Sequence, residues 1–154
     1  MNGLSEETVH ILAARCKESV LGERAVLWAR RMLDADYASE SLVLLAGEQP
    51  LFHEWVVVDF FDRAIAEHGI APFTDEGEAA RAVLTVQSQA FVDGRIAREE
   101  FLQSVGWDDL EPADRAAIEG THDPTADMQD WEHQLRAICL AWADSHPVRD
   151  PLTP

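Results

Sequence analysis

The amino-acid sequence predicts an all-α protein, a single-domain bundle of about seven or eight helices. Three observations favour this class. Apolar residues recur at intervals of three and four along most of the chain. No segment alternates apolar and polar residues for long enough to form a strand. Glycines and prolines stand between the apolar patterns, where helices end and begin.

The central helix of this bundle is predicted over residues 51–68, the most apolar stretch of the chain. Its apolar residues fill two adjacent helical rows, Val56 with Phe60 and Val57 with Phe61, so its apolar face is wide and needs cover from several helices. The pattern extends over about five turns, which exceeds the usual length of a strand.

The other helices are predicted from capping residues and from glycines that end helices. Ser5 is the expected cap of the first helix and Ser39 that of a short third one, while Gly69 and Gly94 suit left-handed positions after helices. Residues 1–146 form the predicted domain and residues 147–154 a frayed C-terminal tail. The further predicted helices are 5–22, 23–35, 40–46, 75–92, 97–105, 112–119 and 125–144. The helices 51–68, 75–92 and 125–144 are expected to share one core.

Composition limits where the protein acts. The chain has 154 residues and 47% apolar residues, enough to bury a core without disulfides. The two cysteines, Cys16 and Cys139, fall within apolar helical patterns, which indicates buried thiols in a reducing compartment. The N-terminus lacks the features of a signal peptide, and no apolar run is long enough to span a membrane. We therefore expect a cytoplasmic protein without membrane association.

The charge of the chain is strongly negative, with a formal net charge of −17. This disfavours nucleic acid as a direct ligand, because such binding depends on basic groups at phosphates, and it favours a basic protein partner. The acids concentrate between Glu99 and Glu132, where eleven acidic residues stand against Arg115 alone. The acids are Glu99, Glu100, Asp108, Asp109, Glu111, Asp114, Glu119, Asp123, Asp127, Asp130 and Glu132.

The partner-binding site is predicted in the middle of this acidic segment, which hereafter means residues 99–132. A cationic partner would be steered towards a surface of this charge, and a tryptophan rimmed by carboxylates is typical of a binding hot spot. The predicted binding residues are Trp107, Asp108, Asp109, Glu111 and Asp114. We therefore predict a non-catalytic protein that binds another protein and needs no cofactor.

Two alternatives remain open. A metal-binding protein or metal-dependent enzyme could use the acids and histidines of residues 119–133, and the candidate ligands are His122, Asp127, Asp130 and His133. A small-molecule binder could have an apolar pocket beside helix 51–68. No catalytic motif is complete: His53-Glu54 lacks the second histidine of a zinc helix, and the loop around Asp93-Gly94 lacks the first two carboxylates of a calcium site.

The segments Trp28-Ala29, Leu42 to Gly47, Phe60 to Ala64 and Val92 to Ile96 resemble a set of small acidic bacterial proteins of uncharacterised function, over roughly residues 20–105. No functional residue is carried over by this resemblance. The acidic, helical character is also similar, at the level of class, to bacterial immunity proteins that neutralise cationic nuclease toxins. That likeness implies binding of a basic protein without catalysis.

Overall fold

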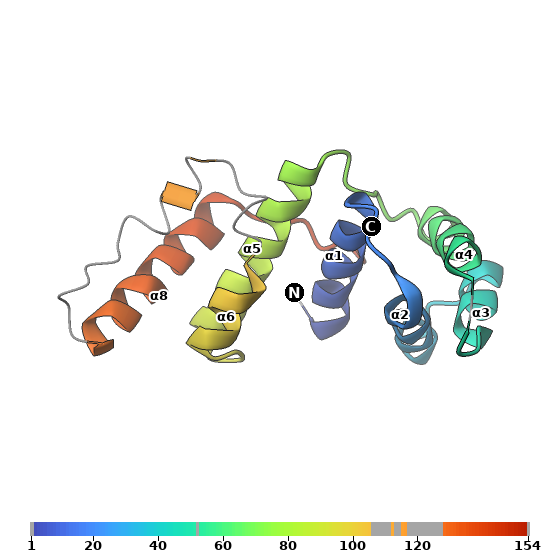
Figure 1. Cartoon of the computed structure of the whole chain (residues 1–154), viewed down its shortest axis with the longest axis horizontal. Helices are drawn as coiled ribbons and strands as arrows, with labels where there is room; N and C mark the ends of the chain where they lie inside the picture. Colours follow the sequence, from blue (N-terminus) through green and yellow to red (C-terminus); the bar gives the residue numbers. More distant parts are fainter. Residues whose placement is uncertain (1, 52, 106–111, 113–114, 117–127, 154) are drawn as a thin grey trace. The chain divides into compact units, whose positions relative to one another are not determined.

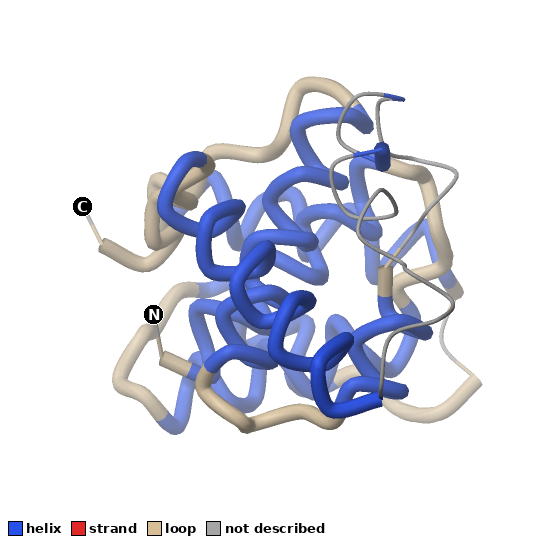
Figure 2. The backbone as a smooth tube through the Cα atoms, turned by 90° about the vertical axis from the view of Figure 1, so that its left-hand side faces the viewer, coloured by secondary structure: helices blue, strands red, loops and turns tan. Residues whose placement is uncertain are grey.

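The computed structural model describes residues 2–51, 53–105, 112, 115–116 and 128–153, with the side chains of the last helix described from Glu132 onward. Within these residues the chain is all-helical, as the sequence predicts, with seven helices and no strand (Figures 1 and 2). They divide into two compact units, residues 1–75 with 149–154 and residues 76–148. Each unit is described by itself, and the single domain predicted over residues 1–146 stays a prediction.

Most helices lie close to their predicted ranges, but the first helix ends at Cys16 and not near Gly22 as predicted, because the chain turns at Glu18, which has a φ of 51°. The first unit contains α1 (Gly3–Cys16), α2 (Gly22–Asp34), α3 (Glu40–Gly47) and α4 (Glu54–Glu67). The second unit contains α5 (Glu76–Val92), α6 (Arg98–Ser104) and α8 (Met128–Ser145). Of the short helix predicted over residues 112–119, the structure describes residues 112, 115 and 116, which are helical.

The first core forms where the wide apolar face of α4 meets α2 and α3. Trp28 of α2 and Phe61 of α4 are fully buried, and their rings meet edge to face with centroids 5.1 Å apart. The indole Nε1 of Trp28 donates a hydrogen bond of 2.9 Å to Thr8 Oγ1 of α1, so its polar atom is satisfied within the core. This network joins three helices around one buried tryptophan.

The polar residues of α4 hold its three neighbours in place. The Glu54 carboxylate accepts hydrogen bonds from the backbone N–H groups of Leu21 (2.6 Å) and Gly22 (3.1 Å), at the start of α2. The Glu67 carboxylate accepts from the Ser41 hydroxyl (2.7 Å) and from its backbone N–H (3.2 Å), at the start of α3. Carboxylates at these positions satisfy N–H groups that have no partner inside their own helix.

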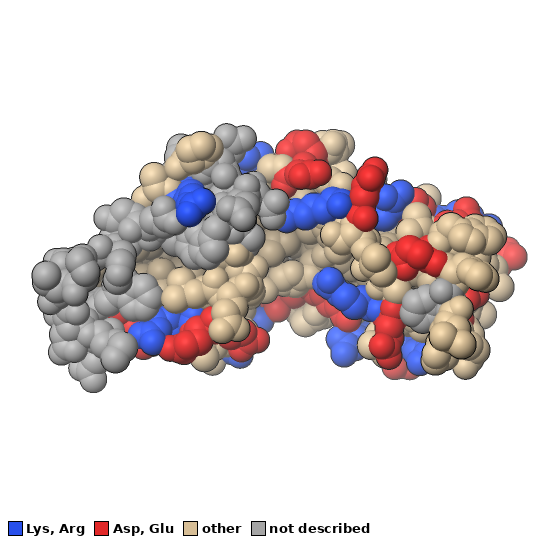
Figure 3. Space-filling model, viewed as in Figure 1, with Lys and Arg blue, Asp and Glu red and all other residues tan. Residues whose placement is uncertain are grey.

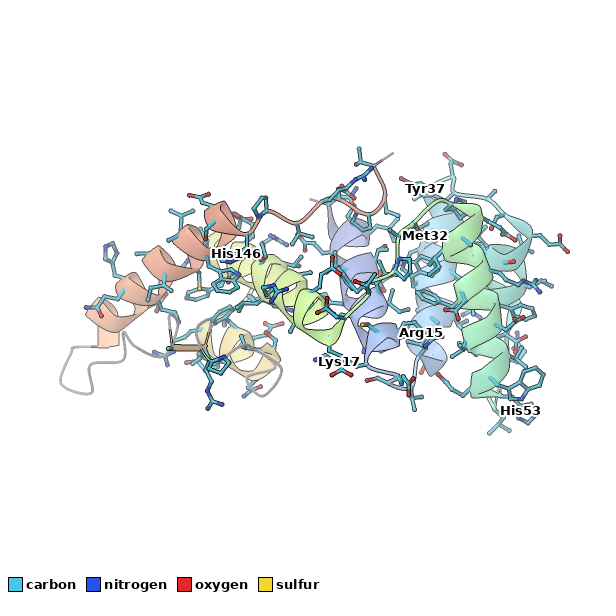
Figure 4. The ribbon with its side chains drawn as sticks, turned by 90° about the horizontal axis from the view of Figure 1, so that it is seen from above. Arg15, Lys17, Met32, Tyr37, His53 and His146 are labelled. Atoms are coloured by element: carbon cyan, nitrogen blue, oxygen red, sulfur yellow. The ribbon has the colours of Figure 1, made fainter. Side chains whose placement is uncertain are left out.

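A third polar contact joins α4 to α1. Both oxygens of Asp62 accept hydrogen bonds from the Arg15 guanidinium, each at 2.9 Å, in a bidentate pair (the Arg15 side chain is labelled in Figure 4). The side chains of α4 thus bond to α1, α2 and α3, but the helix that packs against all three others in the first unit is α2, and not the predicted central helix over residues 51–68.

Several predicted caps are confirmed. Ser39 Oγ accepts from the Leu42 N–H at 3.4 Å, and Gly69 and Gly94 have φ angles of 66° and 71°. The predicted cap at Ser5 is wrong, because Asn2 Oδ1 accepts the Ser5 N–H at 2.8 Å and α1 begins at Gly3. Asparagine is as good a cap as serine. Ser5 is instead buried inside the first turn.

The C-terminal residues contact the first unit. Leu152 packs against the first core, and its carbonyl accepts a 3.5 Å hydrogen bond from the Tyr37 hydroxyl. One apolar side chain and one backbone carbonyl thus join residues 149–153 to the first unit, and the frayed tail predicted over residues 147–154 stays a prediction.

The second unit has its own core between α5 and α8, with Phe101 and Val105 from the α6 region. Trp142 Nε1 donates a 3.1 Å hydrogen bond to Thr85 Oγ1. Phe91 and Phe101 are fully buried and their rings stack with centroids 5.3 Å apart. Of the three helices expected to share one core, the last two contribute to this cluster, whereas the buried residues of α4 belong to the cluster of the first unit.

Candidate functional site

The predicted partner-binding residues Trp107, Asp108, Asp109, Glu111 and Asp114 lie outside the described residues. The described chain fixes the helices on either side of them, because α6 ends at Ser104 and α8 begins at Met128. Both helices pack on α5 in the second unit. The acidic segment therefore begins and ends on helices of the same core.

The charge of the second unit comes from this segment. Residues 76–148 contain fifteen acidic and five basic residues, a formal charge of −10. Outside residues 99–132, the same unit has four acidic and four basic residues and is formally neutral. In the first unit, acidic and basic side chains are interspersed over the face shown in Figure 3.

Two of the described acids at the edges of the segment, Glu99 and Glu132, have arginine side chains beside them. Glu99 and Glu100 are exposed on the first turn of α6. A hydrogen bond from its own backbone N–H, together with the neighbouring Arg98 guanidinium, lowers the pKa of Glu99. At the other edge Glu132 pairs with Arg136 of α8 at 3.1 Å. The lowered pKa favours the ionised form of Glu99.

Arg136, in the middle of α8, contacts the end of α5. Its Nη1 donates to the backbone carbonyls of Phe91 (2.8 Å) and Val92 (3.2 Å), and its guanidinium lies 4.5 Å from the centroid of the Phe91 ring. A cation at the carboxyl end of a helix satisfies carbonyls that have no partner within that helix. The acidic segment thus ends at Glu132, one helical turn before Arg136, whose guanidinium makes three contacts with the end of α5.

The alternative metal site is not assembled in the described chain. His122 and Asp127 lie outside the described residues, and so does the side chain of Asp130. His133 is exposed on α8. Among the residues that were placed, no group of three or more histidine, cysteine or acidic side chains could hold a metal ion. The metal-site prediction and the small-molecule prediction both stay predictions.

The cysteines are both free thiols. Cys139 is buried on α8, and burial raises the pKa of its thiol to about 11. Cys16 is half-buried near the end of α1. A thiol with a raised pKa is a poor nucleophile at neutral pH, so Cys139 has the properties of a packing residue.

One exposed aromatic feature was not predicted, and it lies at the start of α4. Trp55 is 72% exposed and Leu51 is 98% exposed with a φ of 77°, an unusual backbone conformation for leucine. The His53 ring stacks on Trp55 with centroids 6.4 Å apart. The sequence carries a signal for this, because Trp55 shares its helical row with Asp59 and Asp62 and not with the buried residues.

The described ranges contain no helix long and apolar enough to cross a membrane. Comparisons of the chain with protein-family models, with curated proteins and with solved structures give no match. The class that the structure defines is therefore an all-helical chain in two compact units.

Proposed function

We propose that this protein binds a basic protein partner through its acidic segment and performs no catalysis. The observation that carries the proposal is the charge of the second unit, which is −10 in residues 99–132 and formally neutral elsewhere. Charge concentrated in one segment steers an oppositely charged protein towards that segment, because acidic residues far outnumber basic ones there.

The structure of the flanking helices supports this role. α6 and α8 both pack on α5, and Arg136 in the middle of α8 binds the carboxyl end of α5. A binding segment carried between two packed helices loses less conformational freedom on binding than one at a free terminus. The steering residues are Asp108, Asp109, Glu111 and Asp114, and Trp107 is the proposed apolar anchor that slows dissociation.

The partner class follows from the same chemistry. A surface of carboxylates repels the phosphates of nucleic acid, so the partner is a protein with a basic face. A cationic nuclease toxin is the partner that the likeness to immunity proteins implies, and such a toxin would be found in the reducing interior where free cysteines persist. In that case the protein would block the nucleic-acid-binding face of the toxin.

Trp107→Ala tests the anchor. The purified protein is immobilised, basic proteins retained from a lysate of the source cell are identified, and the dissociation rate of the retained partner is measured for the native chain and the variant. We expect the substitution to raise the dissociation rate at least about tenfold, as is typical of a tryptophan hot spot. Trp55→Ala, an exposed tryptophan of the first unit, is the matched control and should leave the rate unchanged.

Two results would count against the proposal. One is retention only of neutral or acidic proteins, because the steering argument requires a basic partner. The other is an equal dissociation rate for Trp107→Ala and Trp55→Ala, which would remove Trp107 from the interface. Inhibition of the retained partner's nuclease activity, if it has one, then tests the immunity role directly.

A further inference from the structure

The C-terminal residues 149–153 form a compact segment on the first unit, here called the strap. Within the strap, the Leu152 N–H donates to Asp150 Oδ1 at 2.9 Å and the Thr153 N–H donates to the Asp150 carbonyl at 3.2 Å. These local bonds form a turn within the strap.

The attachment of the strap to the first unit is weak. The apolar contact is through Leu152, which is only half-buried, and the hydrogen bond from the Tyr37 hydroxyl to the Leu152 carbonyl is 3.5 Å long. Hydroxyl-to-oxygen hydrogen bonds are usually 2.5–3.0 Å long, so this one contributes little. Segments with few buried contacts open locally at much lower free energy than the whole fold.

A buried polar atom near the strap also favours opening. The Tyr37 ring packs edge-on against His68, with centroids 5.9 Å apart. His68 Nε2 is buried and has no hydrogen-bond partner among the described residues. A buried ring nitrogen without a partner is destabilising, and access of water would relieve this. Figure 4 shows Tyr37 at the end of the first unit opposite His53. This agrees with its contact to His68, because His53 and His68 cap the two ends of α4.

We propose that the strap is a releasable closure of the first unit, and that its opening uncovers Tyr37 and the edge of His68 while helices α1 to α4 stay folded. The fold gives the strap a further consequence through chain connectivity. The second unit ends at Val148 and the strap begins at Arg149. When the strap is released, the second unit stays connected to the folded part of the first unit only through the chain at Asp75.

The test uses Tyr37, which is the only tyrosine in the chain. The full-length protein is treated with tetranitromethane, and the rate of tyrosine nitration reports how often the ring is uncovered. Leu152→Ser removes the apolar contact of the strap, and Thr153→Ser, at an exposed neighbouring position, is the matched control. We expect Leu152→Ser to raise the nitration rate at least several-fold, with helix content by circular dichroism unchanged, and Thr153→Ser to behave as the native chain.

Two outcomes overturn the inference. Equal nitration rates in all three proteins would show that the strap does not cover Tyr37. Loss of helix content in Leu152→Ser would show that Leu152 is an integral part of the first core and not part of a releasable segment. A second readout, the single ¹⁹F resonance of the chain labelled with 3-fluorotyrosine, distinguishes these outcomes, because local opening shifts or broadens it while the spectrum of a folded protein is kept.

Discussion

At the scale of single residues, both units use the same device to bury a tryptophan. In the first unit Thr8 Oγ1 donates to the Leu4 carbonyl at 2.8 Å and accepts from Trp28 Nε1. In the second unit Thr85 Oγ1 donates to the Arg81 carbonyl at 2.9 Å and accepts from Trp142 Nε1. Each threonine thus satisfies a buried indole and its own hydroxyl together.

Replacing each threonine by valine, which has a similar shape, isolates the hydrogen bond. We expect Thr8→Val and Thr85→Val each to lower the free energy of unfolding by about 1–3 kcal/mol, because the buried indole N–H loses its acceptor. Urea denaturation measures the loss. Thr153→Val at an exposed position is the control, and stabilities within about 0.5 kcal/mol of the native chain for all three variants would contradict the account.

The thiols give a second test at this scale. Because burial raises the pKa of Cys139 to about 11, its thiol stays protonated at pH 8. We expect iodoacetamide to alkylate Cys139 at least about tenfold more slowly than the half-buried Cys16, since the thiolate is the reactive form. Peptide mass spectrometry follows both sites. Equal rates under native conditions would mean that α8 does not bury Cys139.

At the scale of the helices, local patterns predict the elements well. Ser39, Gly69 and Gly94 end or begin helices where their chemistry requires, and no long-range information is needed for that. The start of the central helix is predicted at residue 51 but lies at Glu54. Leu51 instead takes a left-handed conformation, which an apolar residue next to proline does not signal in the sequence.

The long-range roles of charged residues were not predictable. Helical periodicity places Glu54 and Glu67 on the polar face of α4, where solvation is the default expectation. Their function as caps of α2 and α3 depends on which helix ends lie beside them. That information is in the tertiary arrangement and not in the local pattern.

Glu54 provides a test of this capping role. We expect Glu54→Ala to lower the free energy of unfolding by about 1–2 kcal/mol, because two N–H groups at the start of α2 lose a charged acceptor. Glu54→Gln keeps one acceptor oxygen and should lose less. Urea denaturation compares the three chains, and a stability of Glu54→Ala within about 0.5 kcal/mol of the native chain would show that the carboxylate hydrogen bonds contribute little.

Glu67 gives a pH dependence of known sign. Hydrogen bonds from Ser39 and Ser41 lower the pKa of Glu67 in the folded protein. A carboxyl group whose pKa is lower when folded stabilises the fold above its unfolded pKa of about 4.5, and this contribution is lost as the pH falls through the lower folded value.

We therefore expect the stability of the native chain to fall more steeply between about pH 5 and pH 3 than that of Glu67→Gln. Urea unfolding at a series of pH values makes the comparison. Glu40→Gln, at an exposed position on the first turn of α3, is the control. Parallel pH profiles for the native chain and Glu67→Gln would contradict the stabilising role of the ionised carboxylate.

At the scale of the whole molecule, the sequence predicts the fold class but not the grouping of the helices. All the helices have similar apolar faces, so periodicity alone cannot decide which faces pack together. The structure assigns Phe61 and Trp28 to one core and Phe91 and Trp142 to another. The candidate site differs in this respect, since its charge is read directly from composition, whereas the arrangement of residues 107–114 depends on tertiary structure.

The central claim is that the acidic segment steers a basic partner, and the association rate tests it most directly. The triple reversal Asp108→Lys, Asp109→Lys and Glu111→Lys is compared with Glu23→Lys, Asp34→Lys and Glu40→Lys, which makes the same change of charge at exposed positions of the first unit. Association with the retained partner is measured by stopped flow at low and at high salt.

We expect the reversal in the acidic segment to slow association by about tenfold or more at low salt, and the difference to shrink at high salt as the charges are screened. The control reversal should have a much smaller effect, because its charges lie outside the steering segment. An association rate that is the same for the two triple variants, or that does not depend on salt, would contradict the account.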